Sequence, residues 1–147
     1  MIRMRMTQRF FDSRAVLAKV DIAARRVLSK FGAFVRRAAR SSIRSRRRAS
    51  APGQPPSSHT GLLKRFLWFA YEPQRRNVVI GPARLRRKGR GAAPSLLECG
   101  GVLRQGLAGQ GRSKRKRVVK IRPRPFMGPA FEKEQPRLPA MWADSIR

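Results

Sequence analysis

Apolar residues recur every three or four positions through the first part of the chain. The repeat runs through Val16, Val20, Ala24, Val27, Phe31, Val35 and Ala38. This spacing predicts an amphipathic helix with one buried face. Asp12 or Ser13 can cap its start, and we place the helix at residues 13–47. A helix of this extent is about 50 Å long, which exceeds what a compact domain of this size needs. We therefore expect part of it to pack on another subunit.

The periodicity stops at a stretch rich in proline, glycine and serine. Residues 48–61 hold three prolines, two glycines and several serines, which exclude a helix or a central strand and predict a linker. Large apolar side chains then fill residues 62–71, and a turn-like stretch separates them from the β-branched residues 77–80. This order predicts a β-hairpin with a loop of about five residues.

The rest of the chain alternates short apolar stretches with basic, glycine-rich ones. Residues 94–99 are compatible with one helical turn or with the entry to a strand, and residues 118–121 with a third strand. Gly- and Arg-rich loops are expected at 82–93 and 104–117. Pro129 fits the first turn of a helix, which Pro136 and Pro139 should break, and a last helical piece should follow.

This order of elements predicts an α+β fold. A long N-terminal amphipathic helix packs on a small antiparallel β-sheet, and a C-terminal helix follows. We expect a single domain over residues 1–147 with four segments. They are the long helix (13–47), the linker (48–61), the hairpin and sheet with basic loops (62–121) and the C-terminal helical segment (122–147).

The charge of the chain is extreme for its length. Lys and Arg total 36 against 7 Asp and Glu, which gives a net charge of +29. Such an excess calls for an anionic partner: nucleic acid, a membrane surface or an acidic protein. The alternative is that the basic segments are simply solvated and extended by their own repulsion. Candidate contact residues are Arg44, Arg46, Arg47, Arg48, Arg84, Arg86, Arg87, Lys88, Arg90, Arg112, Lys114, Arg115, Lys116 and Arg117. Aromatic residues are not interleaved with them, so base stacking is unsupported.

Little in the sequence points to catalysis. The single histidine, His59, lies in the predicted linker, and the single cysteine, Cys99, is expected to be a half-buried apolar residue. A Cys–His nucleophile pair is conceivable, but neither residue lies in a recognisable motif. We therefore predict that the protein is not an enzyme and has no metal or other cofactor. No apolar stretch reaches the roughly 18 residues that span a bilayer, and residues 1–6 are not followed by the apolar stretch of a signal peptide.

Four short stretches carry a family resemblance. They are 49–64 (ASAPGQPPSSHTGLLK), 79–82 (VIGP), 96–101 (LLECGG) and 124–131 (RPFMGPAF). In this order they resemble the tail-component family of long-tailed bacteriophages, which includes tail-completion and neck proteins and is similar to minor tail protein Z. The resemblance covers about residues 20–145. Relative to that family, the chain is more basic, above all in its loops at 84–91 and 104–117.

The matched residues have structural rather than catalytic roles. Glu98, before two glycines, can pair with a basic residue, accept backbone N–H groups where the chain reverses, or be a solvated surface acid. The extended entry 124–126 should place Phe126 in the core. The structural motif consists of Thr60, Gly61, Glu98, Gly100, Arg124, Pro125, Phe126 and Pro129.

The resemblance implies a virion structural protein of the neck or tail end. It would assemble as a ring, commonly of six subunits, and contact the tail tube and the connector or stopper, within the virion and, during assembly, in the host cytoplasm. The basic loops would line a channel that carries DNA or grip acidic surfaces of neighbouring rings, and no membrane is involved. The alternative is a nucleic-acid-binding protein, such as a ribosomal protein with basic extensions, which the charge and the Gly/Arg loops favour.

Overall fold

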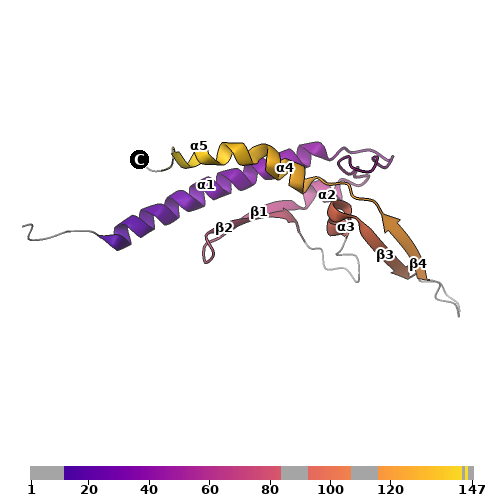
Figure 1. The fold of residues 1–147 in the computed structure, drawn as a ribbon, viewed down its shortest axis with the longest axis horizontal. Coiled ribbons are helices and arrows are strands. Elements are labelled where there is room, and N and C mark those ends of the chain that lie inside the picture. The colour runs from indigo at the N-terminus through magenta and orange to yellow at the C-terminus, as the bar shows by residue number, and fades with distance from the viewer. Residues whose placement is uncertain (1–11, 84–92, 107–115, 144, 146–147) are drawn as a thin grey trace, which may run out of the picture.

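One long helix organises the molecule (Figure 1). The computed structural model describes residues 12–83, 93–106, 116–143 and 145. The fold is α+β, as predicted, with a long N-terminal helix, antiparallel strand pairs and C-terminal helices. In chain order the elements are α1 (Ser13–Ser42), α2 (Leu62–Arg65), β1 (Leu67–Glu72), β2 (Asn77–Pro82), α3 (Ala93–Cys99), β3 (Gly101–Gly106), β4 (Lys116–Ile121), α4 (Met127–Glu134), the 3₁₀ turn η1 (Gln135–Arg137) and α5 (Leu138–Ala143).

Helix α1 begins where the sequence predicts and ends earlier. The Asp12 side chain caps it by accepting a hydrogen bond from the Ala15 N–H at 3.1 Å. The helix stops at Ser42 instead of residue 47, because Ile43 turns to an extended conformation and is fully buried. The hydroxyls of Ser41 and Ser42 donate to carbonyls of the last turn, which satisfies groups that a continuing helix would have used. Residues 44–48 therefore leave the helix.

Strands β1 and β2 form the predicted hairpin. They pair antiparallel from Leu67 opposite Pro82 to Glu72 opposite Asn77, and residues 73–76 connect them. The first strand is shorter than the sequence suggests, because residues 62–65 form the single turn α2 after Gly61, whose φ is 69°. One face of the hairpin packs on α1 through Leu67, Phe69 and Ile80.

The prediction of one sheet is only partly right. Strands β3 and β4 form a second, separate two-stranded ribbon, with Gly101 opposite Ile121 and Gly106 opposite Lys116. The strand at 118–121 is confirmed as part of β4. Strand β3 was not predicted, because two glycines bound it and its residues 104–106 fall in the glycine- and arginine-rich stretch that was assigned to a loop.

The C-terminal segment packs along α1 beside the hairpin (Figure 1). The predicted break by two prolines is only partly right. Helix α4 does end at Glu134, but Pro136 lies in the 3₁₀ turn η1 that leads directly into α5. Pro139 lies in the first turn of α5, where a backbone N–H would have no partner within the helix, so a proline is tolerated. The core where these elements meet consists of Phe31, Val35, Ala39, Ile43, Leu67, Phe126 and Ala130.

The predicted linker at 48–61 is a packed loop. Ser50, Pro56 and Ser58 are buried in it. The Ser58 N–H donates to the Arg44 carbonyl at 2.9 Å, and Arg44 and Ser57 form an isolated parallel bridge. The composition correctly excluded a regular element here, but these contacts tie the loop back to the end of α1.

Gly32 allows the hairpin to approach α1 closely, and this contact generates a first prediction. A Cβ atom at Gly32 would lie 2.8 Å from Val78 Cγ2 and 3.0 Å from Phe69 Cδ2. Alanine stabilises a helix interior by about 1 kcal/mol over glycine, but overpacking costs about 1–3 kcal/mol. We expect Gly32→Ala to lower the free energy of unfolding by about 1 kcal/mol in urea titrations.

The double variant Gly32→Ala/Val78→Ala provides the control. With the Val78 methyl groups removed, Gly32→Ala should lose most of its cost or become stabilising. A Gly32→Ala variant that is more stable than the parent protein in both backgrounds would show that this contact does not limit the packing.

Candidate functional site

Glu98 links two parts of the chain through one carboxylate. The Phe126 N–H donates to Glu98 Oε2 at 2.9 Å, and the Gly128 N–H donates to Oε1 at 2.8 Å. The Met127 N–H lies 3.1–3.2 Å from both oxygens. These are the first N–H groups of α4, which have no partner within the helix, and a negative charge is favourable at this end. Of the three roles open to Glu98, the structure shows the acceptance of backbone N–H groups.

Other residues of the family-like stretches meet at the same junction. The Arg124 N–H donates to the Leu97 carbonyl at 2.6 Å, and its guanidinium Nε donates to the Ser50 carbonyl at 3.0 Å. The Gly53 N–H donates to the Pro123 carbonyl at 2.9 Å. Three of the four stretches, 49–64, 96–101 and 124–131, are thus joined by hydrogen bonds.

The remaining motif residues lie around this junction. Gly100 has a φ of 74°, and a Cβ atom there would lie 3.0 Å from Pro123 Cδ. Phe126 is 1% exposed, in the core as expected, and Pro129 lies in the first turn of α4. Thr60 is exposed beside the left-handed Gly61, which precedes α2 rather than the hairpin itself. Pro125 is half-buried before Phe126.

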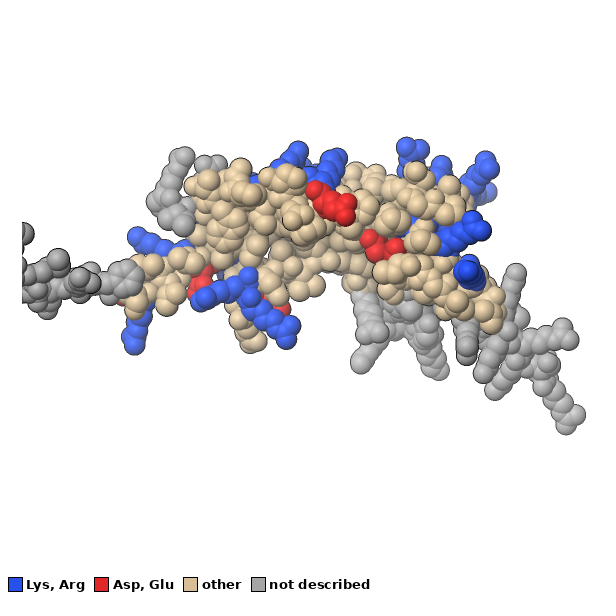
Figure 2. All heavy atoms as spheres, in the orientation of Figure 1, with Lys and Arg blue, Asp and Glu red and all other residues tan. Residues whose placement is uncertain are grey.

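Of the fourteen candidate basic contact residues, six lie within the part of the chain that the structure describes. Arg44, Arg46, Arg47 and Arg48 are exposed in the loop after α1. Lys116 and Arg117 belong to β4, opposite Gly106 and Gln105. Eight others lie outside the described residues: Arg84, Arg86, Arg87, Lys88, Arg90, Arg112, Lys114 and Arg115. Figure 2 shows Lys and Arg side chains along the whole described length of the molecule, several of them at the end where the loop after α1 lies.

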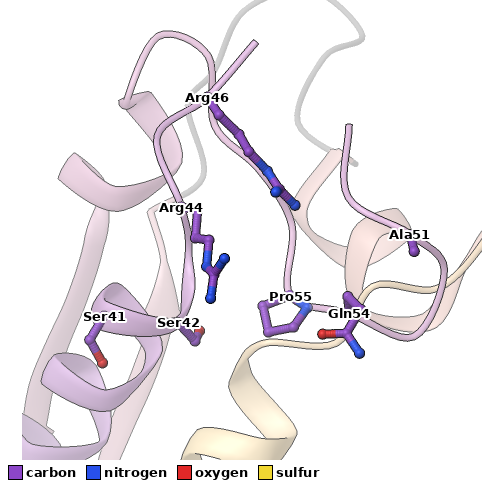
Figure 3. Close-up of a pocket in the computed structure, with 7 residues that line it drawn as sticks. All are labelled: Ser41, Ser42, Arg44, Arg46, Ala51, Gln54 and Pro55. Carbon is purple, nitrogen blue, oxygen red and sulfur yellow. The ribbon is translucent and has the colours of Figure 1, made fainter. Parts of the chain in front are cut away.

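The loop after α1 encloses a basic hollow of about 410 Å³ (Figure 3). Arg44 and Arg46 both line this hollow; the Arg44 guanidinium lies between the end of α1 and Pro55, and Arg46 extends along the segment that leads to Pro55. The Arg46 Nε donates to Ser57 Oγ at 2.9 Å. The lining residues are Ser41, Ser42, Arg44, Arg46, Ala51, Gln54 and Pro55. We name this set the basic hollow.

The arginines of the basic hollow were predictable from the sequence, but its opposite wall was not. Gln54 and Pro55 were assigned to a linker, and their return to the end of α1 depends on the buried Pro56 and on the Ser58–Arg44 hydrogen bond. The X-Pro-Gly-X sequence at 51–54 predicts a turn, and Gly53 has a φ of 78°. This turn is the feature of the sequence that could have predicted the return of the chain toward the end of α1.

The apolar stripe of α1 is exposed in the N-terminal part of the helix and buried in the rest of it. Val16, Leu17 and Val20 are 44%, 51% and 40% exposed, whereas Val27, Phe31 and Val35 are buried. A second hollow of about 390 Å³ lies on this part of α1 and also includes Ser145. The outer face of the hairpin is apolar as well, since Trp68 and Val79 are 55% and 59% exposed. The Arg36 guanidinium carbon lies 5.4 Å from the centre of the Trp68 ring.

Both residues weighed for catalysis lie at the surface of the described structure. His59 is exposed, and Cys99 is exposed rather than half-buried as expected. Within residues 12–83, 93–106, 116–143 and 145, no group of three or more His, Cys, Asp or Glu side chains is placed to hold a metal ion. In the same ranges, no helix is both long and apolar enough to cross a membrane.

No protein-family model, no curated protein and no solved structure matches this chain.

The Glu98 contacts generate a second prediction. Hydrogen bonds to a charged group contribute about 1.5–3 kcal/mol each, and Glu98→Ala leaves three backbone N–H groups without this acceptor. Because Glu98 is half-exposed, water can accept hydrogen bonds from some of these N–H groups in the variant. We expect Glu98→Ala to lower the free energy of unfolding by about 2–3 kcal/mol in urea titrations.

Two variants accompany this measurement. Glu98→Gln keeps one acceptor oxygen but loses the charge, so its effect should be intermediate. Glu132→Ala removes an exposed carboxylate from the same helix that Glu98 caps and should change the stability by less than about 0.5 kcal/mol. Equal effects of Glu98→Ala and Glu132→Ala would contradict the assignment.

Proposed function

We propose that this chain is a structural protein of the neck or tail end of a long-tailed bacteriophage. It assembles as a ring of identical subunits, commonly six, that completes the tail and joins it to the head. Its other partners are the tail tube and the connector or stopper. The protein acts by contact and has no catalytic role.

The observation that carries the proposal is the continuation of the α1 stripe beyond the core of its own chain. Val16 and Val20 stand on the same helical face as Ala24, Val27 and Phe31, but no described element of the chain buries them. Apolar side chains that extend a buried stripe into solvent are typical of an interaction surface. The exposed Trp68 and Val79 supply a second apolar surface on the hairpin.

The choice of a phage ring among possible assemblies comes from the family-like stretches. Their residues hold the loop after α1, helix α3 and the start of α4 together through hydrogen bonds. We therefore treat these stretches as one structural unit. The long amphipathic helix and the hairpin then remain available for contacts between subunits.

A third prediction tests the assembly through one stripe residue. Val20→Asp places a charge in the proposed subunit contact, where burial of an unpaired charge is unfavourable. We expect the apparent dissociation constant of the assembly to rise at least tenfold, which corresponds to about 1.4 kcal/mol, in sedimentation velocity experiments. Negative-stain imaging of the parent protein should show rings. The stability of the single chain should change little, because Val20 is already 40% exposed.

Ala18→Asp is the matched control for this experiment. It makes the same change of charge on the exposed, opposite face of the same helix, so it should leave assembly unaltered. A parent protein that stays monomeric at every concentration and binds one defined RNA would overturn the proposal in favour of a ribosomal-type protein.

A further inference from the structure

We infer that the basic hollow is a binding site for a phosphate of a nucleic-acid backbone, read without base specificity. The inference deepens the proposed function and rests on it in one respect: double-stranded DNA is the nucleic acid that a neck protein meets. The site belongs to the single chain, because all seven lining residues lie between 41 and 55.

The guanidinium donors of the hollow are available and partly pre-oriented. In the described part of the chain, carboxylates form ion pairs with Arg75, Arg76 and Arg137, and none pairs with Arg44 or Arg46. The bond from Arg46 Nε to Ser57 Oγ holds the guanidinium in place and leaves its two terminal nitrogens to donate elsewhere. Guanidinium groups bind phosphate through two parallel N–H bonds, and prior orientation lowers the entropy lost on binding.

The lining of the hollow includes no acidic residue that would repel an anion. The helix carbonyls nearest to it would repel one, since the C-terminal end of a helix carries partial negative charge. The Ser41 and Ser42 hydroxyls, however, donate to the carbonyls of Ala38 and Ala39 at 2.8 Å and so neutralise part of this effect. Gln54 adds a side-chain amide that can donate to a phosphate oxygen.

The surroundings favour a nucleic acid over an acidic protein. Protein–protein interfaces have an apolar centre from which charged residues are depleted, whereas protein–DNA interfaces are more polar and much more positive. Ala51 and Pro55 are the apolar residues that line the basic hollow, and Arg40, Arg47 and Arg48, which are close to its arginines in sequence, are exposed as well. No aromatic side chain lines it, so it offers contact to the backbone and not to a base.

The test measures DNA binding by fluorescence anisotropy with two duplexes of about 20 base pairs and unrelated sequence, over a range of salt concentrations. The parent protein should bind both duplexes equally. Arg44→Ala/Arg46→Ala should weaken binding of both about tenfold or more and reduce the slope of log K against log salt by about one. Arg44→Lys/Arg46→Lys keeps the charge but loses two-bond contacts, so it should fall between the parent protein and the alanine variant.

The matched control is Arg25→Ala/Lys30→Ala, which removes two exposed positive charges from α1 outside the hollow. It should weaken binding no more than about threefold, as expected for charges that contribute only to the general field. An equal loss in this control would overturn the inference. Arg44→Ala alone keeps the Arg46–Ser57 bond, so it should weaken binding even if the double variant disturbs the loop.

Two further outcomes separate this inference from the proposed function. A poly-glutamate peptide that binds more tightly than DNA, and loses its affinity in Arg44→Ala/Arg46→Ala, would identify an acidic protein as the occupant and overturn the inference. A protein that forms rings but binds DNA equally well with and without these arginines would overturn the inference alone. A monomer that binds DNA through them would overturn the proposed function alone.

Discussion

The packing of the hairpin on α1 is the contact on which the rest of the described fold depends. A two-stranded ribbon is at best marginally stable in water, and both strand pairs here consist of two strands only. Strands β1 and β2 gain their stability from the buried stripe of α1, and Gly32 sets how closely they approach it. Helices α4 and α5 cover another side of the same stripe, so α1 provides the surface that these layers share.

The elements with strong local signals were predictable from the sequence. The period of α1, its cap at Asp12, the turn at 73–76 and the start of α4 near a proline all follow from nearby residues. The errors arose where distant contacts decide. Helix α1 ends early because Ile43 is drawn into the core, and β3 exists through its pairing with β4, in which Gly101 lies opposite Ile121.

The candidate site was predictable in its residue types but not in its shape. Charge alone marked Arg44 and Arg46, and their position after a helix that ends at Ser42 required the structure. Glu98 was open to three roles, because a carboxylate before two glycines has no fixed partner in sequence. Its partners, the first N–H groups of α4, lie 28–30 residues further along the chain. Contacts over such distances leave no local pattern to read.

The Glu98 contact also determines how the β3–β4 ribbon is attached to the rest of the protein. The chain leaves at Glu98 and returns at Phe126, and one carboxylate fastens both points together. Strands β3 and β4 extend from this closed base as one ribbon, and the closure does not depend on the length of the ribbon. Because loop-closure entropy rises by only about 0.6 kcal/mol for each doubling of length, residues can be inserted or removed between β3 and β4 with little effect on the core. The length of the β3–β4 ribbon can therefore change while the packing of α1, the hairpin and α4 stays the same.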